Sequence, residues 1–353
     1  MTFRRCVYRH LGGWMGLHVT LNARRRVALV FTAVLLIVAG SLSLERGAGA
    51  KPNNCHKTKT CSTTTTTAPT TTTTTAPTTT TTVTPPSVQT ATFRLGPFEL
   101  APEGSPGSDS ESAQANIPKP SGAFGIVGMR FDLVHADGTS EDHNNVHLHH
   151  TVFMDSSRPD SICPSLPNRF VGAGAERTPV SFGTEYAYKV GATDQWSALW
   201  HIMNMSTETH TVYIQYEIDY VTGADLAAMR PLTSYFYDVD GCWGDSAYNV
   251  PGGGGPGSVY TKAITYTAPR NGTRVFTGGH LHDGGIDLIL EQNGVEVCRP
   301  TAIYMDGMLD AITYCDTPVS VAAGTTIRLT SRYSNEFPLT AVMGISLSYV
   351  WEP

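Results

Sequence analysis

Apolar and polar side chains alternate at every second residue over much of this 353-residue chain, which restricts it to a fold built from strands. In residues 211–221 the apolar members share one side of an extended backbone and the polar members share the other. No long segment after residue 90 has the 3.6-residue period of an amphipathic helix. Comparable strand patterns occur at residues 124–134, 146–154, 196–205, 258–267, 273–282, 285–292, 325–333 and 341–351.

Turn-forming residues separate these strands. The chain has 34 glycines and 22 prolines, which favours short strands joined by turns. Asn293-Gly294 lies between two apolar runs and predicts a tight hairpin, and a glycine-rich break at residues 251–257 precedes a second set of strands. We therefore predict an all-β fold with two jelly-roll-like β-sandwich domains, one over residues 91–230 and one over residues 231–353.

The region before residue 91 has a different composition. Three arginines, the last of them Arg26, precede an apolar run, and small residues ending at Ala50 offer a cleavage site, so residues 1–50 are expected to be a signal peptide or a signal anchor. Residues 51–90 form a Thr-, Ala- and Pro-rich linker that cannot bury a core and is expected to be a disordered stalk. The chain is thus predicted to be secreted or held at the cell surface, with the N-terminal segment as a means of attachment to the cell envelope.

Cysteine number and net charge limit the partners and the compartment. Six cysteines remain once Cys6, which precedes the signal core, is set aside, and an even number in an exported chain predicts disulfides. A formal net charge of −6, with no basic stretch beyond the export region, argues against a nucleic-acid partner. Nearness in sequence, followed by elimination, gives the pairs Cys55–Cys61, Cys298–Cys315 and Cys163–Cys242.

One short histidine motif is a candidate metal site. His280 and His282 occupy positions i and i+2 of a predicted strand, so their side chains project to the same face and can chelate one ion. Two hydrogen-bonded surface histidines would give the same pattern, but a second histidine motif in a chain of low charge favours the metal. Asp283 is either an acceptor that orients one of these imidazoles or a turn residue. Imidazole suits copper, zinc, iron or nickel.

The second motif, residues 147–150, leaves two pairings open. His147 and His149 share a face of a regular strand. His149 and His150 can bind one ion only where the strand bends or bulges. His201, on another predicted strand, could supply a further nitrogen ligand.

Met343 decides which metal is expected. It lies in an apolar run and is either a core methionine or a thioether ligand that completes a site with His280 and His282. A thioether ligand selects copper over zinc, particularly in the Cu(I) state. Copper is therefore the predicted cofactor, with two ions if both histidine sites are intact.

Taken together, these motifs resemble the copper type II, ascorbate-dependent monooxygenases, the group of the peptidylglycine hydroxylating and dopamine β-monooxygenases. The adjacent pair His149-His150 resembles the ligands of one copper in that family. His280 and His282 resemble its His-x-His motif, and Met343 resembles its thioether ligand. Over residues 91–353 the chain is most similar to an uncharacterised branch that contains the stress-up-regulated nodulin proteins and bacterial relatives. The resemblance implies two β-sandwich domains with one copper on each.

Two positions depart from that family. The hydroxylases carry a third histidine on a strand corresponding to residues 213–217, where this chain has none, so that either His201 replaces it or the first site is incomplete. Gly278 stands where the peptide hydroxylase has an arginine that helps to hold its substrate. Peptide amides are therefore not implied as substrates.

The resemblance implies a possible monooxygenase that hydroxylates a C–H bond of a small-molecule substrate with O2 and an external reductant such as ascorbate. His280, His282 and Met343 would hold the catalytic copper, while the copper near His149 and His150 would pass an electron. Two alternatives stay open. One is a non-catalytic copper-binding or copper-handling surface protein, and the other is a structural surface β-domain without metal.

Overall fold

The computed structural model describes residues 85–242 and 246–353 of the chain. Its first half, up to the short helix α1, consists of β1 (Gln89–Leu100), β2 (Asp109–Ala115), β3 (Phe124–Val134), β4 (Val146–Pro159), β5 (Pro167–Ala173), β6 (Val180–Ser181), β7 (Tyr186–Val190), β8 (Trp196–Asn204), β9 (His210–Val221) and α1 (Gly223–Ala228). Its second half consists of β10 (Arg230–Asp238), β11 (Tyr248–Val250), β12 (Val259–Thr267), β13 (Gly272–Leu281), β14 (Gly285–Gln292), β15 (Val295–Cys298), β16 (Ala302–Met305), β17 (Met308–Ile312), β18 (Val319–Val321), β19 (Thr326–Ser334), β20 (Leu339–Val342) and β21 (Gly344–Trp351).

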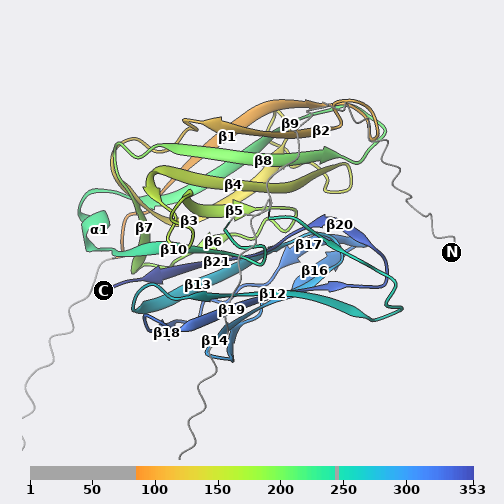
Figure 1. The fold of residues 1–353 in the computed structure, drawn as a ribbon. Helices are drawn as coiled ribbons and strands as arrows, with labels where there is room; N and C mark the ends of the chain where they lie inside the picture. The colour runs from red at the N-terminus through yellow and green to blue at the C-terminus, as the bar shows by residue number, and fades with distance from the viewer. Residues whose placement is uncertain (1–84, 243–245) are drawn as a thin grey trace, which may run out of the picture. The chain divides into compact units, whose positions relative to one another are not determined.

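The predicted all-β fold is confirmed, and its strands form one large sheet, two four-stranded covering sheets and the two-stranded sheets β11-β20 and β16-β17 (Figure 1). The large sheet runs β1-β9-β3-β7-β10-β21-β13-β18, with β6 added beside β3. The sheet β2-β8-β4-β5 covers its first half, and β12-β19-β14-β15 covers its second half. The predicted boundary at residues 230 and 231 falls at the start of β10, which continues the large sheet, and the division into two domains stays a prediction.

The first core fills the space between β9 and β3 of the large sheet and β4 and β8 of the covering sheet. Val212, Ile214, Tyr216 and Ile218, at alternate positions of β9, are all 0 % exposed. The ring of Tyr216 meets that of Phe153 on β4 edge-on, with centroids 4.8 Å apart. The two-residue alternation in the sequence therefore corresponds to an inner and an outer face of this strand.

Strand β21 is buried on both faces. Ile345, Leu347 and Tyr349 face the side of the first core, whereas Val350 belongs to the second core, which the large sheet forms with β14 and β19. The hydroxyl of Tyr349 donates a hydrogen bond to the carbonyl of Phe170 on β5, at 2.6 Å, and so ties the covering sheet of the first half to this strand. The middle strands of the large sheet thus separate the two cores and contact both.

Two of the three predicted disulfides are confirmed, Cys163–Cys242 and Cys298–Cys315. Such bonds favour an oxidising, extracytoplasmic environment. The predicted pair Cys55–Cys61, the export signal at residues 1–50 and most of the linker at residues 51–90 lie outside the described residues. Within the described residues, no helix has the length and apolar character needed to cross a membrane.

The two disulfides differ in how much of the chain they close, and this predicts different contributions to stability. Replacing Cys163 and Cys242 with alanine should lower the free energy of unfolding more than the same replacement of Cys298 and Cys315. The bonds span 79 and 17 residues, for which chain entropy gives about 4 to 5 and about 3 kcal/mol respectively. Denaturant unfolding of both double variants measures the difference, and equal losses would contradict the chain-entropy argument.

Candidate metal centre

The histidines of both motifs meet between the covering sheet of the first half and the middle strands of the large sheet. On β8, Trp200 and Ile202 are buried in the first core, so that His201 between them emerges on the opposite face of the strand. On β13, Leu281 belongs to the second core, and His280 therefore points the other way, toward β4 and β8. The alternation of each strand thus turns both sets of imidazoles toward one another.

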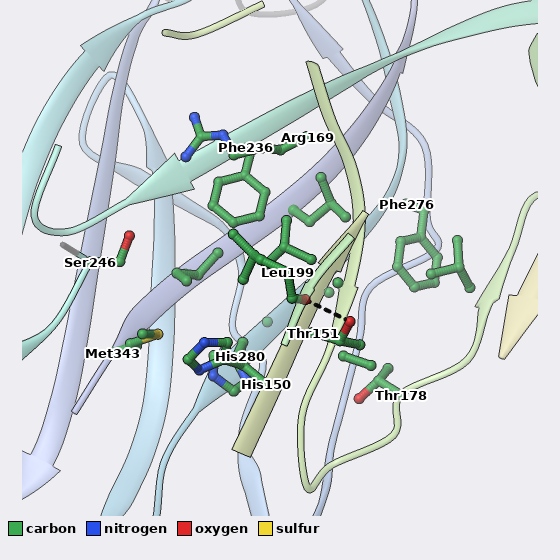
Figure 2. Close-up of a pocket in the computed structure, with 18 of the residues that line it drawn as sticks. His150, Thr151, Arg169, Thr178, Leu199, Phe236, Ser246, Phe276, His280 and Met343 are labelled. Carbon is green, nitrogen blue, oxygen red and sulfur yellow. Dashed lines mark hydrogen bonds between the residues drawn. The ribbon is translucent and has the colours of Figure 1, made fainter. Parts of the chain in front are cut away.

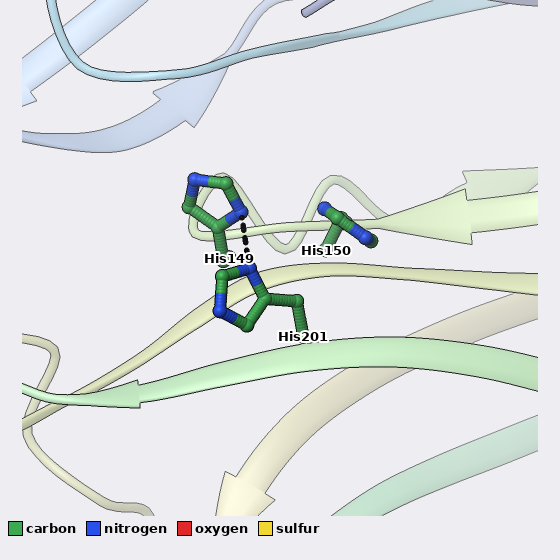
Figure 3. A group of neighbouring side chains, drawn as sticks. All are labelled: His149, His150 and His201. Carbon is green, nitrogen blue, oxygen red and sulfur yellow. Dashed lines mark hydrogen bonds between the residues drawn. The ribbon is translucent and has the colours of Figure 1, made fainter. Parts of the chain in front are cut away.

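A β-bulge brings His149 and His150 to the same place. In the pairing of β4 with β8, Leu148 lies opposite Ile202 and His150 opposite His201, which leaves His149 as the extra residue. The Nδ1 atoms of His149 and His201 are 3.1 Å apart. Ligand nitrogens of His149, His150 and His201 all lie within 4.8 Å of one another (Figure 3). Of the two pairings that the sequence left open, the bulge brings the adjacent pair together.

A second set of nitrogens converges at the end of β13. The Nε2 atoms of His280 and His282 are 3.1 Å apart, and nitrogens of His150, His280 and His282 lie within 4.8 Å of one another. Two imidazoles bound to one tetrahedral ion at ~2.0 Å have nitrogens ~3.3 Å apart. Both short nitrogen pairs therefore have a separation that a shared ion requires.

The two sets form one cluster rather than two separate sites. We call the five residues His149, His150, His201, His280 and His282 the histidine cluster. His150 belongs to both sets, and the ring centroids of His149 and His282 are 3.9 Å apart. The sequence predicted one histidine group in each half of the chain, and the fold brings the groups into contact.

Burial keeps the imidazoles of His149, His150 and His282 neutral. Burial, followed by the charges of His150 and His201, lowers the pKa of His149 to about 2. Burial, followed by the charges of His280 and His201, lowers the pKa of His150 to about 3. Burial, followed by His280, holds the pKa of His282 well below its usual range. A neutral imidazole keeps one nitrogen lone pair free, and this is the form that binds a metal ion.

Two buried nitrogens at the site have no hydrogen-bond partner. They are the Nδ1 atoms of His147 and His150. Buried polar atoms in native proteins are nearly always paired, and Nδ1 of His150 is unpaired within a group of converging imidazoles, where a metal ion can be its partner. The donor set therefore fits a metal ion. His147 itself belongs to neither converging set, and its ring centroid is 6.2 Å from that of His149.

Glu176 contacts the histidine cluster but was not among the predicted site residues. Its carboxylate oxygens lie 3.1 and 3.2 Å from Nδ1 of His280, and its side chain is 2 % exposed. When Nδ1–H donates to this carboxylate, the lone pair of His280 is on Nε2, which faces His282. Glu176 and His280 are 104 residues apart in the sequence, so no local sequence pattern indicates this contact.

The loop that carries Glu176 reaches His280 because residue 174 is a glycine. A Cβ added at Gly174 would lie 2.5 Å from Cε1 of His280, which is closer than any real contact. Asp283, the acceptor considered from the sequence, instead accepts a hydrogen bond from the backbone N–H of Leu309 at 2.8 Å. The imidazole is thus oriented from the first half of the chain rather than by its neighbour in sequence.

Met343 lies at the break between β20 and β21, beside the histidine cluster. Leu281 pairs with Gly344, so one further step along each strand brings His282 and Met343 opposite each other. The hydroxyl of Tyr333 accepts a hydrogen bond from the backbone N–H of His282 at 2.8 Å and donates one to the carbonyl of Met343. This one buried hydroxyl therefore fixes two candidate ligand segments relative to each other.

Comparison with known proteins finds two relatives whose names include copper. The chain is 25 % identical over 253 residues to the probable copper-dependent oxygenase M1 of Phoma sp. (strain ATCC 20986 / MF5453), over 64 % of this chain and 63 % of that protein. It is 25 % identical over 250 residues to the probable copper-dependent oxygenase clz3 of Cochliobolus lunatus, over 63 % of this chain and 78 % of that protein. The chain thus resembles copper oxygenases, although the match spans less than two thirds of the first of them.

Two further comparisons add no argument. No family model matches the chain. The structure of the Macrobrachium rosenbergii nodavirus aligns with 84 % of this chain and 98 % of its own chain, at 9 % identity and a TM-score of 0.20. A TM-score this low carries no inference about fold or function.

The link through Tyr333 gives a testable prediction. Replacing Tyr333 with phenylalanine leaves the His282 N–H and the Met343 carbonyl unpaired in a buried place, and should lower the free energy of unfolding by about 2 to 4 kcal/mol. Tyr220→Phe is the matched control, because that hydroxyl bonds only to the exposed side chain of Gln89. Denaturant unfolding measures both variants, and a loss no larger than that of the control would show that the link is dispensable.

Proposed function

We propose that this chain is an exported copper-dependent oxygenase whose histidine cluster and Met343 hold copper. The observation that carries the proposal is that His150, His280 and Met343, from three separate parts of the chain, line one cavity together (Figure 2). A donor set of imidazole and thioether favours copper over zinc. The similarity to two proteins named as probable copper-dependent oxygenases supports the same metal.

The proposed reaction is hydroxylation of a C–H bond in a small molecule. Copper held by these residues would supply the one-electron chemistry toward O2 that imidazole and thioether groups do not have. Hydroxylation by one O2 consumes two electrons and two protons and yields the alcohol and one water, so the reaction needs an external reductant as a partner. The chain contributes the neutral imidazoles of His149, His150 and His282, a cavity beside them, and the Glu176 carboxylate, which would accept a hydrogen bond from Nδ1–H of His280.

Export is part of the proposal. It rests on the apolar segment and cleavage sequence within residues 1–50 and on the two disulfides. The Thr-rich linker would then act as a spacer between the folded part and the cell envelope.

A second candidate function is that of a non-catalytic copper-binding protein, and one observation favours it. His150 belongs to both sets of converging nitrogens, and the rings of His149 and His282 are in contact. Two ions would then compete for one imidazole. A chain that holds a single ion has no second copper to store an electron for the proposed reaction.

Copper stoichiometry on the purified full chain tests the proposal. We expect up to two copper ions per chain, loss of at least one in His280→Ala, and a lower Cu(I) affinity in Met343→Leu, because leucine keeps the volume but lacks the thioether. Substrate-dependent O2 consumption with ascorbate then separates the oxygenase from the non-catalytic protein.

Two variants serve as matched controls for the copper measurement. His135→Ala removes an imidazole that is 41 % exposed and outside the histidine cluster, and Met129→Leu removes a thioether in the first core. Both should keep the parent stoichiometry and affinity. A parent protein that binds no copper under metal-replete conditions would overturn the proposal.

The contact between Glu176 and His280 predicts a graded effect on copper affinity. Glu176→Gln weakens the acceptor that fixes the imidazole, and losses of this kind lower metal affinity about 10- to 100-fold. Asp283→Asn is the control, because its carboxylate bonds to the backbone of Leu309 and not to an imidazole. Competition titration with a copper chelator measures both, and equal affinities in the two variants would contradict the role given to Glu176.

A further inference from the structure

The histidine cluster borders a cavity of about 250 Å³ between β4, β8 and the middle strands of the large sheet. His150, His280 and Met343 form one part of its wall (Figure 2). Gly278 leaves room beside these residues, because a Cβ added there would lie on the cavity side, 3.2 Å from the ring of Phe276. The rest of the wall is mainly apolar, and its largest members are Leu199, Phe236, Phe276, Ile345 and Leu347.

The hydroxyl groups that line the cavity are already engaged. Thr151 donates to the carbonyl of Leu199 at 2.9 Å, and Thr178 donates to the carbonyl of Ile312 at 3.3 Å. The hydroxyl of Ser246 donates a hydrogen bond to the buried carboxylate of Asp238. A ligand in this cavity would therefore gain little from carrying hydrogen-bonding groups of its own, and would lose their hydration.

The two charged residues of the lining do not offer a site for an anion. Nε of Arg169 is paired with Asp160 at 2.9 Å and the guanidinium stacks over the ring of Phe236 at 4.1 Å, while its buried Nη2 has no hydrogen-bond partner within the described residues. Its charge is therefore compensated inside the protein. Glu111 is exposed, and its negative charge would repel an anionic ligand that enters the cavity.

We propose that this cavity binds a neutral, apolar molecule about the size of one ring with a short alkyl chain, and presents one of its C–H bonds to the metal centre. This inference rests on the proposed function, of which it names the substrate class. A cavity of about 150 Å³ holds benzene, so one of this size accommodates several additional carbon atoms. Peptides and sugars do not match a mainly apolar lining whose hydroxyl groups are internally paired, and carboxylates do not match one whose cation is paired with Asp160 and whose other charged residue is Glu111.

Probe binding to the metal-free full chain tests the inference. We use n-butylbenzene as the apolar probe and 4-phenylbutyrate as its anionic counterpart, with ligand-observed NMR and calorimetric titration as the measurements. The neutral probe should bind at least tenfold more tightly than the anion. Removing one methylene from the chain of the neutral probe should weaken binding about fourfold. Equal binding of the two probes, or none by the neutral probe, overturns the inference.

Substitutions in the wall locate the binding. Val180→Phe fills the cavity and should weaken n-butylbenzene at least tenfold, while Val295→Phe, at a residue that is 66 % exposed, should leave the affinity unchanged. Leu347→Ala enlarges the cavity and should raise the affinity for n-hexylbenzene relative to n-butylbenzene. If Val180→Phe does not fold, the Leu347→Ala result decides, and an unchanged preference between the two probes overturns the inference.

These measurements keep the inference separate from the copper proposal. Because the probes are titrated without metal, apolar binding in a protein that takes up no copper supports the cavity and rejects the metal centre. Copper binding without binding of the apolar probe supports the metal centre and rejects the apolar substrate class. When both occur, bound Cu(II) should broaden the NMR signals of the bound n-butylbenzene, and the absence of broadening would show that the probe lies away from the histidine cluster.

Discussion

Strands β21 and β13 have no face left for water, because the first core and the covering sheet lie on one side and the second core on the other. In such a strand, alternate side chains point to opposite faces. One residue can therefore pack in the second core while its neighbour points toward the metal centre. Leu281 and His280 show this directly. The metal centre depends on this arrangement, since it buries His280 and His282 beside the partly buried histidines of β4 and β8.

Desolvation in turn gives the cluster its chemical character. Water would stabilise the charged imidazolium, and its exclusion holds the pKa values of His149, His150 and His282 far below the ordinary range. These three imidazoles therefore present lone pairs instead of positive charges. Glu176 adds one carboxylate at a single nitrogen of His280, which orients that imidazole.

Local patterns in the sequence were enough to predict nine of the longer strands, two disulfides and the five residues of the histidine cluster, but not the short strands. Alternation predicted the buried face of β9, and Asn293-Gly294 predicted the hairpin between β14 and β15, whose central residues both have positive φ. The convergence of the two histidine groups was not predictable, because it follows from the pairing of β13 with β21 and from the packing of both cores. Glu176 was missed for a related reason: its role follows from a loop that packs on His280, not from its neighbours in sequence.

The exposure of the ligands bears on the choice between an oxygenase and a copper carrier. A carrier must pass its ion to another protein, which requires ligands that the partner can reach. His280 and His282 are only 9 % and 7 % exposed, and Met343 is 9 % exposed. The cavity beside them is lined mainly by apolar side chains, and such a lining suits a small organic molecule better than the surface of another protein. Burial of the ligands together with an adjoining apolar cavity therefore favours the oxygenase, and the shared His150 is the feature of the site that this function has to accommodate.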